Sequence, residues 1–183
     1  MDVLTAITSR ASAVRLTEPG PTPAQLDNIL KAGIRAPDHG RLAPWRFVVL
    51  EGADRNILAR AMADMQRRKT PDAPAEEIER TGLKALRAPT IVVVAARITA
   101  SPKIPDVEQI VAVGAAVQNM FLVAHGLGLG AMWKTGGAAY DPAVKAALGL
   151  EASDHVVAYL YLGTPATPGT PRQNKLDDYM IRR

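Results

Sequence analysis

The spacing of hydrophobic residues along the chain first predicts its helices. In the segment 21–37, "PTPAQLDNILKAGIRAP", apolar residues recur every three or four positions, as on the buried face of a helix. Thr22 can cap this helix, Pro23 takes the favoured first position, and Gln25 completes a capping box. Pro37 ends the run. The segment is therefore predicted as one amphipathic helix with a defined start and stop.

The longest predicted helix is 106–126, "DVEQIVAVGAAVQNMFLVAHG". One side carries an apolar stripe, and further apolar residues leave little polar surface around the rest of its circumference. A helix that is apolar nearly all round is buried, so we expect this one in a core or a subunit interface. Shorter helices are predicted near the N-terminus with Asp2 as a cap, over 54–68, and after Asp141 and Pro142.

Runs rich in β-branched or aromatic residues predict strands at 45–52, 90–97, 130–136 and 155–163. Between Arg67 and Arg87 the chain is charged and punctuated by prolines, which favours an exposed helical excursion or lid over 65–88. The tail from Thr164 is rich in Pro, Gly and polar residues and is expected to wrap over a surface. This order of elements predicts one domain, 1–183, built as an α/β or α+β three-layer sandwich.

Composition narrows the classes of function. Hydrophobic residues make up 48% and charged residues 22%, as in ordinary soluble globular proteins. Lys and Arg are scattered, aromatic residues are only 4%, and the net charge of +4 suits a small anionic ligand at least as well as a nucleic acid. No signal peptide is visible, and apolar tracts such as "TIVVVAA" are shorter than the roughly 20 residues that cross a bilayer. We therefore expect a cytoplasmic protein with no nucleic-acid or membrane partner.

The glycine-rich stretch "HGLGLGAMWKTGG" fits the dinucleotide pattern G-x-G-x-x-[GA] at Gly126, Gly128 and Ala131, and nearly fits a P-loop. A dinucleotide loop follows a strand and opens a helix, whereas here a helix precedes the glycines and a strand follows them. Both phosphate-loop interpretations are therefore rejected. Instead, Gly126 is predicted to cap the helix, and the later side-chain-free backbone is predicted to admit a flat ligand.

Two polar segments are candidates for chemistry. In "SRASAVR", Arg10 and Ser12 suit phosphate oxygens, although a solvated helix end would have the same composition. In the rigid, charged loop "RAPDHGRLAPW", His39 is either functional or a surface histidine paired with Asp38. The chain has no cysteine, no G-x-S-x-G motif and no paired histidine spacing, so disulfides, a nucleophilic hydrolase and a metal site are not expected.

Together, four blocks in order resemble the nitroreductase family of FMN-dependent oxidoreductases, most closely its short-chain branch of NAD(P)H nitroreductases. The four blocks are "RASAVR", which is similar to the family's N-terminal Arg-Arg-Ser signature, "KAGIRAPDHGRLAPWRFVVLEG", "GAAVQNMFLVAHGLGLGAMWKTG" and "YLYLGTP". The resemblance covers nearly the whole chain. It implies an α+β, three-layer α/β/α fold with a central mixed, largely antiparallel sheet, and an extensive homodimer with FMN at its interface.

The resemblance also implies roles for single residues. Arg10 and Ser12 would hold the FMN phosphate and ribityl chain, and Lys134 would be a second phosphate cation. Arg35 and His39 would reach the flavin, from the same subunit or from the partner. No catalytic side chain is implied, because the flavin carries the hydride chemistry. The cofactor-binding residues implied are Arg10, Ala11, Ser12, Arg35, His39, Met132, Trp133 and Lys134.

The implied activity is reduction of FMN by NAD(P)H, followed by reduction of a nitroaromatic, a quinone or a similar acceptor in the same cleft. Three positions depart from the family's pattern. Ala11 stands where the signature has its second Arg, and Arg41 and Ala43 stand where many relatives carry Asn and Gln before Pro-Trp. These departures favour an alternative, a non-catalytic flavin-binding protein that acts as a sensor, carrier or interaction module.

Overall fold

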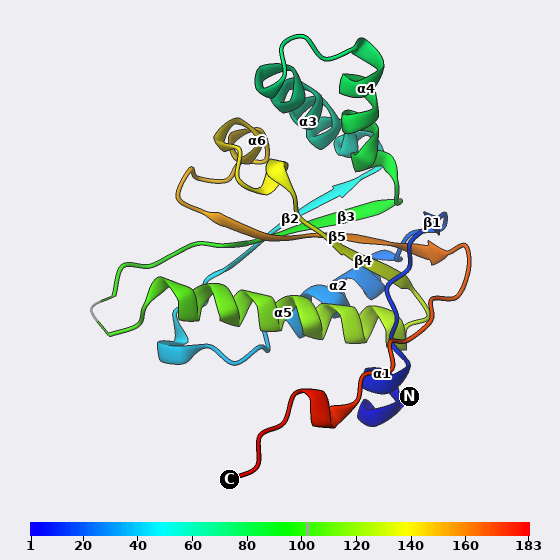
Figure 1. The fold of residues 1–183 in the computed structure, drawn as a ribbon, viewed down its shortest axis with the longest axis vertical. Coiled ribbons are helices and arrows are strands. Elements are labelled where there is room, and N and C mark those ends of the chain that lie inside the picture. Colours follow the sequence, from blue (N-terminus) through cyan, green and yellow to red (C-terminus); the bar gives the residue numbers. More distant parts are fainter. Residues whose placement is uncertain (102) are drawn as a thin grey trace.

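The computed structural model describes residues 1–101 and 103–183. At its centre is a five-stranded sheet in which each described pairing is antiparallel (Figure 1). The order across the sheet is β1-β5-β3-β2, and β4 also pairs with β5. The strands are β1 (Leu16–Thr17), β2 (Trp45–Glu51), β3 (Thr90–Ala96), β4 (Gly130–Lys134) and β5 (His155–Pro165).

Helices cover both faces of this sheet, so the predicted α+β sandwich is confirmed. The helices are α1 (Val3–Ser9), α2 (Pro23–Gly33), α3 (Arg55–Lys69), α4 (Ala75–Leu83), α5 (Asp106–Gly126) and α6 (Pro142–Ala147). In Figure 1, α2 and α5 lie on one side of the sheet, and α3, α4 and α6 lie on the other. The family resemblance therefore implied the correct architecture.

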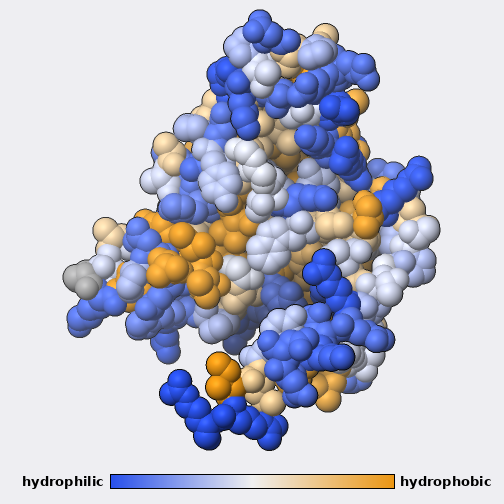
Figure 2. All heavy atoms as spheres, viewed as in Figure 1, coloured by the Kyte–Doolittle hydropathy of each residue, from blue (hydrophilic) through white to orange (hydrophobic). Residues whose placement is uncertain are grey.

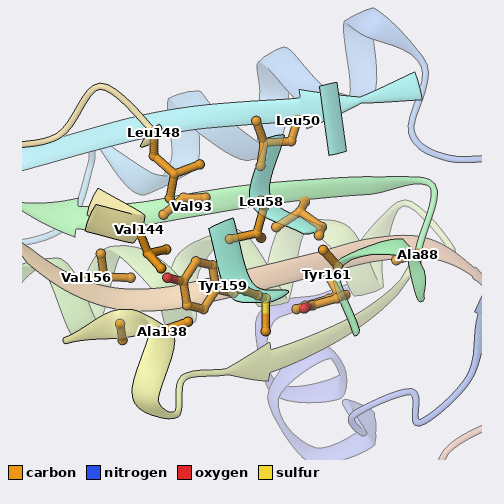
Figure 3. Close-up of a cluster of buried hydrophobic side chains, with 14 of the residues drawn as sticks. Leu50, Leu58, Ala88, Val93, Ala138, Val144, Leu148, Val156, Tyr159 and Tyr161 are labelled. Atoms are coloured by element: carbon orange, nitrogen blue, oxygen red, sulfur yellow. The ribbon is translucent and has the colours of Figure 1, made fainter. Parts of the chain in front are cut away.

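The central strand β3 shows how the sequence builds two cores. Its seven residues are all buried. Because side chains alternate along a strand, Val93 packs with Leu58 of α3 on one face, and Val92 packs with Val113 of α5 on the other. Figure 3 shows the first of these clusters, in which Leu58 lies close to Tyr161 and Val93 of the sheet. A continuous apolar run, rather than an alternating one, is what a strand covered on both faces requires.

Local signals in the sequence placed the start of α2 correctly. The Thr22 hydroxyl accepts from the Gln25 N–H at 3.3 Å, and the Gln25 side-chain oxygen accepts from the Thr22 N–H at 2.9 Å. These two bonds form the predicted capping box, and Pro23 takes the first helical position. The helix ends at Gly33, a turn before Pro37.

The long helix α5 is only partly buried within the chain. Residues such as Val113 and Met120 are fully buried against the sheet, whereas Val107 and Val111 are 61% and 64% exposed. The expectation that no apolar tract reaches bilayer-spanning length is wrong for α5, which is long and apolar enough by length and composition. Its packing on β3, β5 and α2 accounts for that composition as a core helix.

The charged segment 65–88 forms a hairpin of α3 and α4 that projects from the sheet (Figure 1). The C-terminal end of α3 is attached to the rest of the chain, because Arg68 makes two hydrogen bonds with the carboxylate of Asp141, at 2.9 and 3.0 Å. The side chain of Gln66 donates to Glu77 across the hairpin at 3.0 Å. The predicted helical excursion is confirmed, and its behaviour as a lid stays a prediction.

The tail after β5 passes over the exit of α1, as the composition predicted. The Ala166 N–H donates to the Arg15 carbonyl at 3.0 Å. A Cβ added at Gly169 would lie only 2.7 Å from Ala11 Cβ, so the two backbones approach closely there. Beyond this contact the tail extends away from the body (Figure 1), and Tyr179 and Ile181 are exposed.

Candidate functional site

The segment that carries Arg10 begins where α1 ends. Asp2 accepts from the Thr5 N–H and caps the helix, which stops at Ser9. The Ser9 hydroxyl then contacts His125 Nε2 of α5 at 2.8 Å. The Arg10 guanidinium lies over the ring of Phe121, 5.2 Å from its centroid, within the range of a cation–π interaction. Two contacts with α5 thus hold the end of α1 in place.

A cavity of about 800 Å³ opens beside this helix exit, and we call it the first cavity. One wall contains Arg10, Ala11 and Ser12, and the opposite wall is the tail segment 170–174. No carboxylate of the described residues lies within salt-bridge distance of Arg10, so its charge is available to a ligand. The residues that line the first cavity are Ile7, Thr8, Arg10, Ala11, Ser12, Thr170, Pro171, Arg172, Gln173 and Asn174.

Immediately after Ser12, the chain is attached to β4. The Ala13 N–H donates to the Ala131 carbonyl at 2.9 Å. Gly130 makes this approach possible, because an added Cβ there would lie 2.9 Å from Ala13 Cβ and 2.6 Å from Leu16 Cδ2. Gly130 thus admits the chain's own segment 13–16, and the approach of a flat ligand to the later backbone of this stretch stays a prediction. The contact brings the Arg10 segment beside the strand that carries Met132, Trp133 and Lys134.

The three predicted site residues of β4 do not share one face. Met132 packs with the cluster on the α3 side of the sheet. Trp133 lies on the α5 side, where its ring centroid is 6.5 Å from that of Phe121 and its indole N–H donates to the Val157 carbonyl at 2.9 Å. The Ala131 carbonyl points away from β5, because it accepts from Ala13. Along an antiparallel strand the backbone N–H and carbonyl of every second residue point to the same side, so those of Trp133 also point away from β5. Trp133 therefore offers backbone, and Met132 a side chain, to anything beside β4.

A second cavity, of about 310 Å³, lies on the α3 side of the sheet. Met132 and Lys134 line it, so the structure does not bring Lys134 into the first cavity with Arg10 and Ser12. The residues that line the second cavity are Val14, Leu16, Met62, Lys84, Arg87, Met132, Lys134, Thr135 and Tyr161. The segment 10–16 thus contributes to both cavities, with Ala13 between them.

The loop with Arg35 and His39 lies apart from both cavities and faces other hollows. Arg35 lines one of about 510 Å³ with Arg41 and Ala43, and His39 lines one of about 320 Å³ beside α5. The predicted partner of His39 was wrong. His39 Nδ1 pairs with Glu108 of α5, while Asp38 accepts from the Ala43 N–H at 2.6 Å instead.

This loop is also strained. Arg41 and Ala43 adopt positive φ of 55° and 49°, a region that costs L-residues of order 1–3 kcal/mol. The second carboxylate oxygen of Asp38 is buried without a hydrogen-bond partner among the described residues. Strain at the two positions that depart from the family's pattern, together with the unpaired acceptor of Asp38, marks the loop as a functional candidate.

The glycine-rich turn after α5 ends the helix in a way that the sequence only partly predicted. The Leu129 N–H donates to the Ala124 carbonyl and the Gly128 N–H to the His125 carbonyl, which is the Schellman arrangement. Gly128, with φ of 78°, is the left-handed residue, whereas Gly126 is the last residue of the helix itself. The prediction of a helix end is confirmed, and the prediction that Gly126 provides the cap is corrected to Gly128.

Sequence reasoning missed several residues that the fold brings to the two cavities. Arg172 joins Arg10 and Ser12 from the far end of the chain, and Lys84, Arg87 and Tyr161 join Lys134 in the second cavity. Of these residues, only Arg172 was hinted at by the sequence, through the polar composition of the tail. Nothing in the local sequence marks the second group, because its members lie on three separate elements.

Comparison with known proteins gives a consistent result. The sequence pattern of the nitroreductase family matches residues 7–164. The chain is 39% identical over 165 residues to the Escherichia coli K12 protein named "Putative NAD(P)H nitroreductase YdjA", covering 90% of this chain and 89% of that protein. A Haemophilus influenzae protein, "Putative NAD(P)H nitroreductase", is 34% identical with the same coverage of 90% and 89%.

A solved structure agrees with these sequence relatives. The fold superposes with a TM-score of 0.79 on a crystal structure from Desulfovibrio desulfuricans, described as a "putative nitroreductase in complex with fmn". The two chains are 30% identical, and the match covers 100% of this chain and 97% of the other. The similarity therefore extends over the whole fold, including both cavity-lining segments at the termini.

Proposed function

Because the chain belongs to the nitroreductase family, we propose that it is an FMN-dependent oxidoreductase that takes electrons from NAD(P)H and reduces a nitroaromatic, a quinone or a similar acceptor. We place it in the cytoplasm, where NAD(P)H is available. The observation that carries the proposal is the first cavity, in which Arg10 and Ser12 face the polar tail beside the β4 edge. The relatives' names and the FMN complex of a structural neighbour support the same activity.

The residues of the first cavity fit the phosphate of FMN. A phosphate at neutral pH carries close to two negative charges and accepts hydrogen bonds only, so guanidinium and hydroxyl donors suit it. Arg10, Arg172 and Ser12 supply such donors from both walls of the cavity. The cation–π contact with Phe121 limits the motion of Arg10, which lowers the entropy lost when a ligand is bound.

The edge of β4 fits the flat ring system. Isoalloxazine has two apolar faces and a polar rim, so it suits a slot bordered by backbone hydrogen-bonding groups. The Trp133 backbone N–H and carbonyl point away from β5 and supply such groups, and Met132 supplies an apolar side chain. Bound FMN would supply hydride acceptance from NAD(P)H and hydride donation to the acceptor, and the protein would position these partners in turn, giving ping-pong kinetics.

We propose further that the active protein is a homodimer in which Arg35 and His39 approach the partner's cofactor. Within one chain these residues line hollows separate from the first cavity, so a second subunit is needed to bring them to the same site. Figure 2 shows hydrophobic residues gathered beside the start of α5, where Val107 and Val111 are exposed. The exposed apolar tail residues Tyr179 and Ile181 would be covered in the same assembly.

The decisive experiment is the visible spectrum of the purified protein with FMN. We expect a flavin spectrum that survives gel filtration, bleaches when NADPH or NADH is added without oxygen, and returns when menadione is added. A protein that retains FMN but is not bleached would be the non-catalytic flavin-binding protein that Ala11, Arg41 and Ala43 suggest. A protein that does not retain FMN would overturn the proposal.

A further inference from the structure

The second cavity concentrates three positive charges from two separate parts of the chain. Lys84 lies in the 3-10 turn after α4, Arg87 follows that turn, and Lys134 ends β4. Among the described residues, none of the three has a carboxylate within 4 Å. Two cations of the neighbouring α3 are paired, because Arg67 contacts Asp64 and Arg68 contacts Asp141. Three unpaired cations around one hollow create a focused positive field.

The floor of the second cavity is apolar except for one hydrogen-bond donor, the Tyr161 hydroxyl. Met62, Met132 and Tyr161 form that floor. Burial raises the pKa of Tyr161 to about 12, although the nearby Arg87 charge acts to lower it. The hydroxyl therefore stays protonated at physiological pH and remains a hydrogen-bond donor. Donors are thus plentiful in this cavity, and no carboxylate lines it.

The position of the second cavity connects it with the proposed cofactor site. Ser12 lines the first cavity and Val14 lines the second, and two residues of extended chain span only about 7 Å. The two hollows therefore adjoin along the segment 10–16, on either side of the Ala13–Ala131 hydrogen bond. Met132 and Lys134 of β4 line the second cavity. This cavity therefore lies along the strand whose edge is proposed to border the flavin ring.

We propose that the second cavity binds an oxyanion group, a phosphate or a carboxylate, of one of the enzyme's two reaction partners. Lys84, Arg87 and Lys134 neutralise its charge, the Tyr161 hydroxyl donates a hydrogen bond, and the methionines contact the adjoining apolar part. The group belongs either to the 2′-phosphate of NADPH or to an acidic substituent of the acceptor. The inference rests on the proposed function for the identity of these partners, and it assigns them a recognition site outside the first cavity.

Binding calorimetry tests the assignment without turnover. NADP⁺ is compared with NAD⁺, and 4-nitrobenzoate with nitrobenzene, on the FMN-loaded protein and on Lys84→Gln and Arg87→Gln variants. Both side chains are exposed, so these variants should fold normally. Arg80→Gln is the matched control, because Arg80 is an exposed cation of α4 that does not line the cavity. Steady-state KM values for NADPH, NADH and the two nitro compounds provide a second readout.

We expect each variant to weaken binding of one anionic probe about tenfold and to leave its uncharged or less charged counterpart unchanged. Loss confined to NADP⁺ identifies the reductant as the source of the oxyanion, and loss confined to 4-nitrobenzoate identifies the acceptor. Equal affinities in the variants, the Arg80→Gln control and the wild type would overturn the proposal. So would a loss of FMN affinity alone, since the cavity would then belong to the cofactor phosphate. A protein that binds the probes through these cations but shows no flavin bleaching would instead refute the proposed redox function.

Discussion

The first and second cavities adjoin at Ala13 but are lined by different kinds of residue. The first is closed by a polar tail, contains Arg10 and Ser12, and lies beside the end of α1. The second has an apolar floor supplied by the sheet and α3, with cations only at its rim. A tail can open to admit a large ligand once and then close over it, whereas the second cavity has no such cover and keeps its shape. The contrast suits a retained cofactor in one and an exchanging reaction partner in the other.

The contact that separates the two cavities should be the most sensitive point. Gly130→Val would force side-chain atoms into Ala13 and Leu16, so we expect the free energy of unfolding to fall by about 3 kcal/mol. FMN affinity should fall as well, because the segment 10–16 would be displaced. Urea unfolding measures the first effect. Gly126→Val is the control, since a Cβ there would meet no described atom within 4 Å apart from its chain neighbours and its own helix backbone, and equal losses in the two variants would contradict the role of this contact.

Arg10→Ala should impair ligand binding in the first cavity and leave the second cavity unaffected. Loss of a charge-assisted hydrogen bond costs about 1.5–3 kcal/mol, so the Kd for FMN should rise about ten- to a hundredfold. Fluorescence titration with FMN measures the change. Arg15→Ala is the matched control, because Arg15 is an exposed cation that lines neither cavity. Unchanged FMN affinity in Arg10→Ala would remove Arg10 from the phosphate site.

The ion pair between Arg68 and Asp141 attaches α3, which lines the second cavity through Met62. Its removal should therefore leave the first cavity unaffected. Burial acts to raise the pKa of Asp141, but the hydrogen bond from the Val144 N–H and the contact with Arg68 outweigh it and hold that pKa below its ordinary value. Asp141→Ala removes both the helix cap and the ion pair, and should lower stability by about 1–2 kcal/mol at neutral pH.

The pH dependence of this effect follows from the sign of the shift. A carboxyl group with a lowered pKa stabilises the fold above its ordinary value, and this contribution is lost as the pH falls through the folded-state value. The difference in Tm between Asp141→Ala and the wild type should therefore shrink in strong acid. FMN affinity at neutral pH should be unaffected, and a parallel loss of FMN affinity would show that the two cavities are coupled through α3.

The smallest effect is expected from Tyr161→Phe. This variant removes one hydroxyl from the second cavity and should raise the KM for the anionic partner only a few-fold, without a change in FMN affinity. Because the pKa of Tyr161 is raised to about 12, its contribution to stability is lost between the ordinary value near 10 and that value. Tm measured from pH 9 to 12 should accordingly fall less steeply in the variant, and identical slopes would refute the assignment.

Local features of this fold could be predicted from the sequence because their causes lie within a few residues. The capping box of Thr22 and Gln25, the strand at 90–96 and the end of α5 each depend on neighbouring residues alone. Even here, the choice between Gly126 and Gly128 as the left-handed residue depended on a hydrogen bond from Leu129 that composition does not reveal.

Features that depend on distant residues could not be predicted from the sequence. His39 pairs with Glu108 rather than Asp38 because α5 passes beside the loop, and Asp38 is occupied by the Ala43 N–H. The second cavity requires Arg87 and Lys134 to converge, which the pairing of both β3 and β4 with β5 brings about. The family resemblance gave Arg10 and Lys134 related roles, although the structure places them in different cavities.

The tail that closes the first cavity also has a consequence during protein synthesis. Arg10 and Ser12 leave the ribosome early, but the opposite wall, Thr170–Asn174, is translated only after the whole sheet. A nascent chain that lacks this wall has a complete core but only one wall of the first cavity. If the first cavity holds FMN as proposed, firm capture of the cofactor would be delayed until translation has passed Asn174, and truncated chains should fold without retaining it.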